Sequence, residues 1–398
     1  MTDPAMFYPL ASPTWDQAED QAIRRVLASG RHTMGPEVRA FEEAFAAHTD
    51  SPFAVMASSG SAANLLALAG CFWHPDLGWR QGDDIIVPAV SWSTTYFPVT
   101  QLGLRLRFVD IDPQTLNIDP DQVQAAITPR TRAVFAVNLL GNPADLTRLR
   151  RICDDAGILL VEDNCESMGA RLEGRAAGTF GMFGTFSSFF SHHICTMEGG
   201  MVTTPDRRLR DTMLSLRAHG WTRDLPADTH LPLDPDPFLR QFRFVLPGYN
   251  LRPLELEGAL GQSQLARLDS FVAQRRANAS LFCDLFRDCP DVTIQRQTGE
   301  SSWFGFALTL RDRLDGRRPA LVRALAAAGI DSRPIVAGNF LANPVIAKLD
   351  HSVAGPVPVA ENIDRNGLFT GNGHLPLGPQ LTRLREIVEQ VATHGDMT

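Results

Sequence analysis

Short apolar segments alternate with helical patterns between residues 53 and 204. The apolar segments are FAVMA, DIIVP, RLRFVDID, RAVFAVNLL, ILLVED and MVTT, and helical stretches such as SAANLLALAG lie between them. Strands that alternate with helices are joined by right-handed crossovers into a parallel sheet that helices cover on both faces. We therefore predict an α/β fold with a mainly parallel sheet in this part of the chain.

The pattern differs on either side of this region. Residues 36–47, PEVRAFEEAFAA, form an amphipathic helical pattern with Pro at the first turn. From residue 254 to 286 the pattern predicts one long helix, followed by a strand in SSWFGFALTL, a helix near residues 319–328 and a last helix from about Leu381. We predict a large domain with N-terminal helices over residues 1–250 and a smaller C-terminal α/β domain over residues 251–398. Residues 222–245, rich in Pro and Asp, predict a surface loop.

Composition and charge narrow the possible partners. The 398 residues include 37 basic and 45 acidic side chains, a formal net charge of −8, so a broad face for nucleic acid or anionic lipid is not expected. The first residues have no leader pattern, and no stretch approaches the roughly 18 apolar residues of a membrane span. The six cysteines are widely spaced, without a CxxC pair, which favours reduced thiols. We expect a cytoplasmic enzyme with a small-molecule substrate and no membrane partner.

Groups suited to one cofactor lie where predicted strands end. A Ser/Gly turn follows FAVMA, so the free amides of Ser59, Gly60 and Ser61 at the next helix would point at an anion. Trp92 follows VPAVS and could stack on a planar ring, and Asp163 closes ILLVED. Singly, these residues could equally cap helices or pack in the core. Together, a phosphate anchor, a stacking ring and a carboxylate for a protonated ring nitrogen are what pyridoxal phosphate (PLP) requires.

Two further features fit the same interpretation. Ser187, in GTFSSFF, could add a hydroxyl to the phosphate site, and EGG at residues 198–200 predicts a tight turn before MVTT. Two adjacent histidines, His192 and His193, lie between them. A metal site is not expected there, because neighbouring residues of a strand face opposite ways and no other cluster with zinc spacing accompanies them. One histidine is expected to face the cofactor and the other to pack or cap.

The order of the motifs resembles that of the DegT/StrS-type sugar aminotransferases, over nearly the whole chain. The motifs are GPEVRAFEEAF, SSGSAAN, VPAVSW, FVDID, VEDNCES, FSSFF, EGGMV and GYNLRPLE. The resemblance implies the aspartate aminotransferase-like fold of PLP enzymes (fold type I) and pyridoxal or pyridoxamine phosphate as cofactor. Members of the family carry a Lys six residues before the Glu of EGG, where it bonds covalently to the cofactor. This position is His192 here, and the only lysine of the chain, Lys348, lies in a C-terminal segment without a comparable context.

A His at this position resembles the family's PLP-dependent 3-dehydratases of nucleotide-linked 4-keto-6-deoxy sugars. The segments VNLLGNP, RAHGWTR, GESSWFGF and VPAVSWSTTYFP add to this similarity. It implies loss of the C3 hydroxyl of GDP-4-keto-6-deoxy-D-mannose in deoxysugar (O-antigen) biosynthesis, with L-glutamate as amine donor and release of ammonia. His192 would be the acid–base catalyst. A related CDP-sugar enzyme has extra cysteines for an iron–sulfur cluster, but none lies between Cys195 and Cys283 here, so no cluster is expected.

The resemblance implies roles for four more residues. Glu166 corresponds to a residue near the phenolic oxygen of the cofactor, although it could also be a capping carboxylate. Asn250 and Arg252 correspond to residues that reach the cofactor phosphate of the neighbouring subunit in a homodimer. His219 could contact the sugar or pack in the core.

Two other functions stay open on the sequence. A nucleotide-sugar aminotransferase with an unusual base is the first, and the single lysine counts against it. A catalytically dead PLP-binding regulator is the second, but no DNA-binding module is visible and the phosphate, stacking and acid–base positions are all filled.

Overall fold

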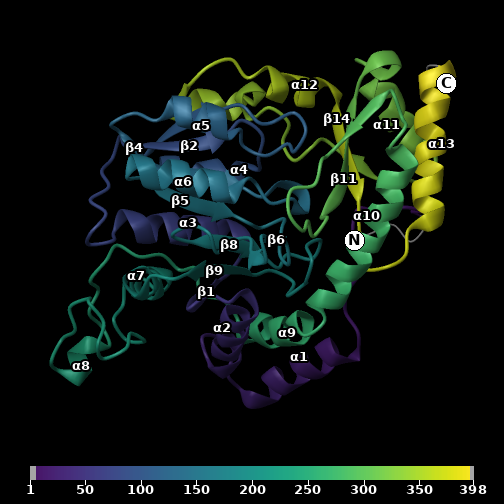
Figure 1. Cartoon of the computed structure of the whole chain (residues 1–398). Coiled ribbons are helices and arrows are strands. Elements are labelled where there is room, and N and C mark those ends of the chain that lie inside the picture. Colours follow the sequence, from purple (N-terminus) through teal and green to yellow (C-terminus); the bar gives the residue numbers. More distant parts are fainter. Residues whose placement is uncertain (1–5, 395–398) are drawn as a thin grey trace.

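An eight-stranded sheet forms the centre of the larger part of the protein (Figure 1). The structure, a computed structural model, describes residues 6–394. The strands are β1 (Phe53–Ala57), β2 (Asp84–Pro88), β3 (Arg105–Val109), β4 (Thr131–Val137), β5 (Leu159–Asp163), β8 (Gly184–Ser187), β9 (Gly200–Thr204) and β13 (His351–Val353). Their order is β1-β9-β8-β5-β4-β2-β3-β13, and only β9 runs antiparallel to its neighbours. The predicted mainly parallel α/β sheet is confirmed.

Helices cover both faces of this sheet, because successive residues of its buried strands point to opposite sides. Ile85 and Val87 pack toward one face and Ile86 toward the other. The first face is covered by α3 (Gly60–Phe72), α4 (Ser93–Gln101) and α7 (Arg207–Arg217), and the second by α5 (Pro120–Ala126) and α6 (Leu146–Ala156). A hairpin of β6 (Arg171–Leu172) and β7 (Arg175–Ala176) lies between β5 and β8 in the chain.

The C-terminal part contains a second, antiparallel sheet in the order β10-β11-β14-β12. Its strands are β10 (Val292–Ile294), β11 (Gly305–Leu310), β12 (Ser332–Arg333) and β14 (Gly367–Gly371), accompanied by α10 (Leu268–Phe286), α11 (Arg318–Ala327), α12 (Pro358–Asn366) and α13 (Gly378–His394). Phe282, Phe306 and Leu384 lie in the core that these elements share. The chain also returns once to the large sheet, where β13 pairs with β3. The domain boundary at residue 250 stays a prediction.

The single long helix expected over residues 254–286 is wrong, because the structure has two helices. The first, α9 (Glu255–Leu265), packs on α1 (Gln17–Ser29) and α2 (Pro36–Thr49), whereas α10 runs along the second sheet (Figure 1). Arg267, at the break, forms ion pairs with Asp16 and Glu19 at the start of α1. Two packing directions and this anchored arginine end the first helix where the sequence has neither Gly nor Pro.

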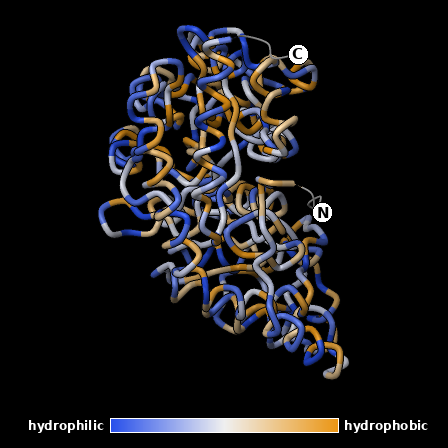
Figure 2. Tube along the Cα trace, turned by 90° about the vertical axis from the view of Figure 1, so that its right-hand side faces the viewer, coloured by the Kyte–Doolittle hydropathy of each residue, from blue (hydrophilic) through white to orange (hydrophobic). Residues whose placement is uncertain are grey.

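Residues 222–245 form the expected excursion, whose only regular element is the one-turn α8 (Pro237–Arg240). It extends away from the rest of the chain beside α7 (Figure 1). Apolar and hydrophilic stretches alternate throughout the molecule (Figure 2), and no helix among the described residues has the length and apolarity needed to cross a membrane. All six cysteines are free thiols.

The fold predicts a strong penalty for a side chain at Gly200. A Cβ atom there would lie 2.1 Å from the carbonyl oxygen of Ser59, so Gly200→Ala must push the start of α3 away from β9. Overpacking of this kind costs about 1–3 kcal/mol. We expect the free energy of unfolding, measured by urea denaturation, to fall by about that amount. Gly355→Ala is the matched control, because its Cβ would meet nothing closer than 3.8 Å. Equal stability of both variants would contradict the proposed close approach of α3 and β9.

Candidate active site

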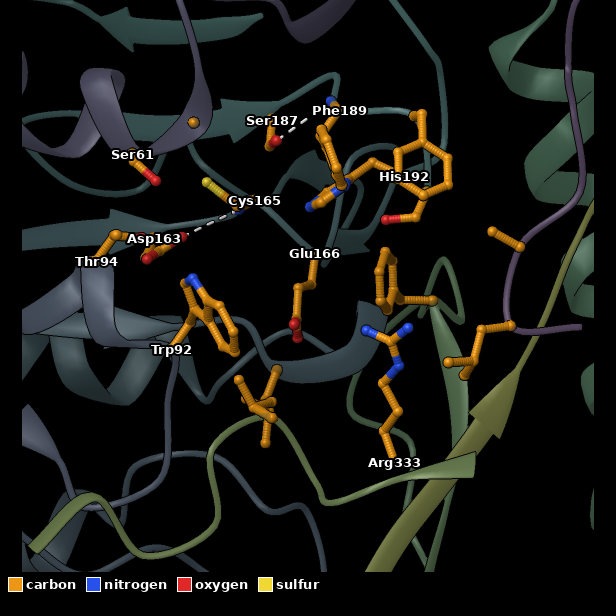
Figure 3. Close-up of a pocket in the computed structure, with 18 of the residues that line it drawn as sticks. Ser61, Trp92, Thr94, Asp163, Cys165, Glu166, Ser187, Phe189, His192 and Arg333 are labelled. Carbon is orange, nitrogen blue, oxygen red and sulfur yellow. Dashed lines mark hydrogen bonds between the residues drawn. The ribbon is translucent and has the colours of Figure 1, made fainter. Parts of the chain in front are cut away.

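A pocket of about 760 Å³ opens at the carboxyl ends of the parallel strands. The large sheet and its helices contribute the starts of α3 and α4, the ends of β5 and β8, and the turn segment 189–192. The second sheet and its loops contribute Phe304, Asp331, Arg333 and Phe369 to the lining. Figure 3 shows Arg333 on the side of the pocket opposite Asp163. The candidate residues Ser59, Gly60, Ser61, Trp92, Asp163, Glu166, Ser187 and His192 all line this pocket.

The start of α3 forms the anion-binding end. Ser59 caps the helix, its hydroxyl oxygen accepting a hydrogen bond from the amide of Ala62 at 3.0 Å. Because the first amides of a helix have no carbonyl partner within it, those of Gly60 and Ser61 are available to a phosphate. A Cβ at Gly60 would lie 2.6 Å from Cβ of Ser187, so glycine lets the helix start approach the end of β8. The Ser187 hydroxyl is thereby brought to the same end of the pocket.

Asp163 is a buried carboxylate held by neutral donors. Oδ2 accepts hydrogen bonds from the Asn64 amide at 2.9 Å and the Thr95 hydroxyl at 2.7 Å, and Oδ1 accepts from the Cys165 amide at 3.2 Å. The Asn64 carbonyl oxygen in turn accepts from the Thr185 hydroxyl. Among the described residues, no cation forms an ion pair with this carboxylate. Its negative charge is therefore available to a cationic group in the pocket.

Trp92 precedes α4 and presents its indole at the pocket wall, with 56% of the residue exposed. The alternative of a tryptophan packed in the core does not apply, because the residue is exposed and lines the cavity. An exposed aromatic face at a pocket wall can stack on a planar heterocycle.

Glu166 is held by a strained backbone turn. Leu140 has a φ of 53°, in the left-handed region that residues other than glycine rarely adopt, and its amide donates to the Glu166 carboxylate at 2.9 Å. Burial and the charge of Asp163 raise the pKa of Glu166 to about 7, against the opposing hydrogen bond from Leu140. A carboxyl group with this pKa can donate or accept a proton near neutrality.

The two adjacent histidines have different environments. His192 lines the pocket and packs against Phe304 with ring centroids 5.2 Å apart, whereas His193 is fully buried and its Nε2 lies 3.2 Å from the carbonyl oxygen of Ser302. The segment contains no strand, so the predicted strand geometry is wrong. Both rings pack against Phe304, but only His192 lines the pocket. Burial, reinforced by the guanidinium of Arg275, lowers the pKa of His192 to about 4. His192 is therefore neutral at pH 7 and able to accept a proton.

Three predicted residues lie outside the pocket of their own chain. Asn250 is exposed and accepts a hydrogen bond from Arg252 Nε at 2.9 Å. His219 packs against Trp221, at the base of the excursion, rather than at the pocket wall. A role for any of these in the site requires a second copy of the chain. The sole lysine, Lys348, is also remote from the pocket lining.

Sequence reasoning did not identify Asn64, Thr95, Phe304 or Arg333. In the sequence, Asn64 and Thr95 are polar residues within helical patterns and carry no functional signal of their own. They donate to Asp163 only because α3 and α4 begin beside the end of β5. The one available signal was that each follows a predicted strand end by a few residues. Phe304 and Arg333 come from the second sheet, which no local pattern ties to the first.

The pocket fits pyridoxal phosphate. The helix start and the Ser187 hydroxyl suit its phosphate, the exposed Trp92 indole suits its ring, and the unpaired Asp163 carboxylate suits its protonated nitrogen. Among the described residues, no group of three or more His, Cys, Asp and Glu side chains is arranged to hold a metal ion.

Comparisons with known proteins agree with this geometry. The chain is 53% identical over 386 residues to a GDP-4-keto-6-deoxy-D-mannose 3-dehydratase of Yersinia pseudotuberculosis, covering 96% of this chain and 98% of that protein. It superposes with a TM-score of 0.94 on the Escherichia coli GDP-4-keto-6-deoxy-D-mannose-3-dehydratase with bound hydrated PLP, at 50% identity over 96% of this chain and 99% of that one. A structure of such an enzyme with a trapped PLP-glutamate geminal diamine gives a TM-score of 0.93, at 50% identity and the same coverage.

The model of the DegT/DnrJ/EryC1/StrS aminotransferase family matches residues 13–393. The chain belongs to this family, and its fold is that of the PLP-dependent aminotransferases.

Proposed function

We propose that this protein is a PLP-dependent 3-dehydratase that converts GDP-4-keto-6-deoxy-D-mannose to GDP-4-keto-3,6-dideoxy-D-mannose. The observation that carries the proposal is His192, a neutral imidazole at the wall of a pocket whose lining suits PLP and includes no lysine. The 53% identity to an enzyme of that name supports the choice of substrate. An aminotransferase is disfavoured, because the sole lysine lies outside the pocket. A cytoplasmic location remains a prediction.

The cofactor would be held by the contacts described above: Ser59, Gly60, Ser61 and Ser187 at its phosphate, Trp92 on its ring and Asp163 at its nitrogen, with Glu166 at the pocket wall near its phenolic oxygen. When bound as the pyridoxamine phosphate, it supplies an amine that condenses with the C4 ketone and a protonated ring that accepts electrons from the adjoining C–H bond. A lysine would compete for this cofactor, and its replacement by His192 separates elimination from transamination.

His192 moves the protons. Because burial keeps its imidazole neutral at pH 7, it can accept a proton as a general base and then deliver it to the C3 hydroxyl oxygen, which leaves as water. One residue thus serves both as base and as acid. L-Glutamate restores the amine and leaves as its 2-oxo acid, so that the net reaction exchanges the C3 hydroxyl for hydrogen and releases ammonia.

A homodimer with shared sites completes the proposal. In the pocket lining, the only Arg or Lys is Arg333, which comes from the second sheet rather than from the phosphate end. Exposed Asn250 and half-buried Arg252 are available to the cofactor phosphate of a second copy. The neighbouring excursion exposes three large apolar side chains, Phe238, Phe242 and Phe244, which are 71%, 58% and 59% exposed, as expected of a segment that a subunit covers. His219, at the base of the excursion, would approach the sugar only in that assembly.

His192→Asn is expected to keep the affinity for cofactor and sugar but to slow C3 elimination by about two to four orders of magnitude, the worth of a positioned acid–base group. Product formation from GDP-4-keto-6-deoxy-D-mannose, followed by mass spectrometry, measures the loss. His193→Asn is the matched control and should be much milder, since His193 faces the Ser302 carbonyl. Loss of turnover in His193→Asn with near-normal His192→Asn would assign catalysis to the other ring.

Asp163→Asn is expected to slow both the glutamate half-reaction and the sugar half-reaction, because an amide cannot hold the proton on the ring nitrogen electrostatically. Absorbance changes of the bound cofactor on mixing with glutamate follow the first half-reaction directly. The control is Asp155→Asn, an exposed position on α6. An unchanged amination rate in Asp163→Asn would remove Asp163 from the proposed site.

Two inactive variants should complement each other if sites are shared. Asn250→Ala and His192→Ala damage the same site from different subunits, so subunit exchange should regenerate some sites with both residues intact. The mixture is assayed for dehydratase activity after mass spectrometry has verified exchange between isotopically labelled copies. No activity above that of the separate variants would show that Asn250 serves no neighbouring site.

A further inference from the structure

The charged groups of the pocket are unequally distributed. Four carboxyl groups line it, contributed by Asp163, Glu166, Glu198 and Asp331, against a single guanidinium, that of Arg333. Burial raises the pKa of Glu166 to about 7 and raises that of Glu198 above its ordinary value, so these two contribute less negative charge than free carboxylates would. His192 adds no charge, because burial lowers its pKa to about 4. Arg333 is therefore the one side-chain cation that the lining of this chain offers to an anionic substrate.

Arg333 has an anchored backbone and an uncommitted side chain. Its residue pairs with Phe369 across the β12–β14 ladder, and Ile335, two residues later, is fully buried. Among the described residues, no hydrogen bond or ion pair is formed by its guanidinium. Figure 3 shows this group directed from the second sheet into the pocket, on the far side of Glu166 from Asp163. The backbone of Arg333 is thus fixed, and its guanidinium is available to a carboxylate or phosphate of a ligand.

The proposed reaction brings two anionic molecules to this pocket, the amino-acid donor and the nucleotide sugar. A guanidinium fork matches one carboxylate bidentately and with equal and opposite charge. The diphosphate of the sugar carries more negative charge, so the carboxylates of Asp163 and Asp331 in the same pocket lining would repel it more strongly. The donor is therefore the better match.

We propose that Arg333 binds a carboxylate of the amino-acid donor, L-glutamate, and so selects the molecule that recharges the cofactor. This inference rests on the proposed function, because it assigns a substrate group within the same site. It makes Arg333 a binding residue for one half-reaction only. The sugar half-reaction, once the amine is present, does not need it.

The test separates the two half-reactions in Arg333→Gln and Arg333→Lys. The first measurement follows the absorbance of PLP-loaded protein against L-glutamate concentration, and the second follows a single dehydration turnover of protein loaded with pyridoxamine phosphate, without glutamate. Loss of a charge-assisted bidentate contact should raise the glutamate concentration for half-maximal rate about 10- to 100-fold in Arg333→Gln. Arg333→Lys should recover part of this loss, and single-turnover dehydration should stay within about threefold of the parent.

Arg311→Gln is the matched control, since Arg311 is an exposed arginine of the same domain, 3.8 Å from Asp312. Its glutamate dependence should equal that of the parent. An unchanged glutamate dependence in Arg333→Gln would overturn the proposal. A higher sugar concentration needed for half-maximal dehydration, together with normal amination by glutamate, would also overturn the proposal, because it would assign Arg333 to the diphosphate. Failure of the parent protein to dehydrate the sugar, with the glutamate effect intact, would contradict the proposed function alone.

Discussion

The buried carboxylate of Asp163 is the constraint on which the site depends. A charge removed from water is costly unless hydrogen-bond donors satisfy it, and here the donors are two helix side chains and the backbone amide of Cys165 after β5. Asn64 belongs to α3, Thr95 to α4, and Thr185 of β8 fixes the orientation of Asn64. Satisfying this one group therefore positions both helix starts against the ends of β5 and β8. Those helix starts carry the anion-binding amides and Trp92.

The same pocket combines the carboxylate of Asp163 with the neutral imidazole of His192, and burial explains why His192 is neutral. Arg275 is buried and donates to the carbonyl oxygens of Trp303, Phe304 and Asn372 at 3.4, 3.2 and 2.9 Å, without a carboxylate partner among the described residues. Its uncompensated positive charge disfavours a second cation nearby, so it adds to the effect of desolvation on the pKa of His192. A lysine amine at this position would meet the same opposition, which would favour its neutral, nucleophilic form. The environment suits either residue at position 192. A lysine there would bond covalently to the cofactor, whereas histidine transfers protons.

The sequence predicted those features that depend on short stretches of chain. Strand ends at Asp163 and Trp92 follow from local apolar runs, and the Ser/Gly turn before α3 follows from the residues themselves. The break between α9 and α10 could not be predicted, since it arises from Arg267 meeting Asp16 and Glu19 some 250 positions away. Different environments for His192 and His193 were expected from strand geometry, yet the segment contains no strand and both rings pack against Phe304. The resemblance identified His192, but the packing explains its neutral charge.

The two parts of the pocket are consequently under different constraints. The large sheet holds its groups through a continuous hydrogen-bond network, in which a change at Asn64 or Thr95 removes one of the three donors of Asp163. The second sheet contributes Arg333, whose side chain forms no bond to another described residue, so its replacement disturbs no other group. A substitution at a position such as Arg333 can therefore change which ligand is bound without disrupting the rest of the site. In a family whose members share a cofactor but differ in the molecules they act on, we infer that selectivity can change on the second sheet while cofactor binding stays fixed on the first.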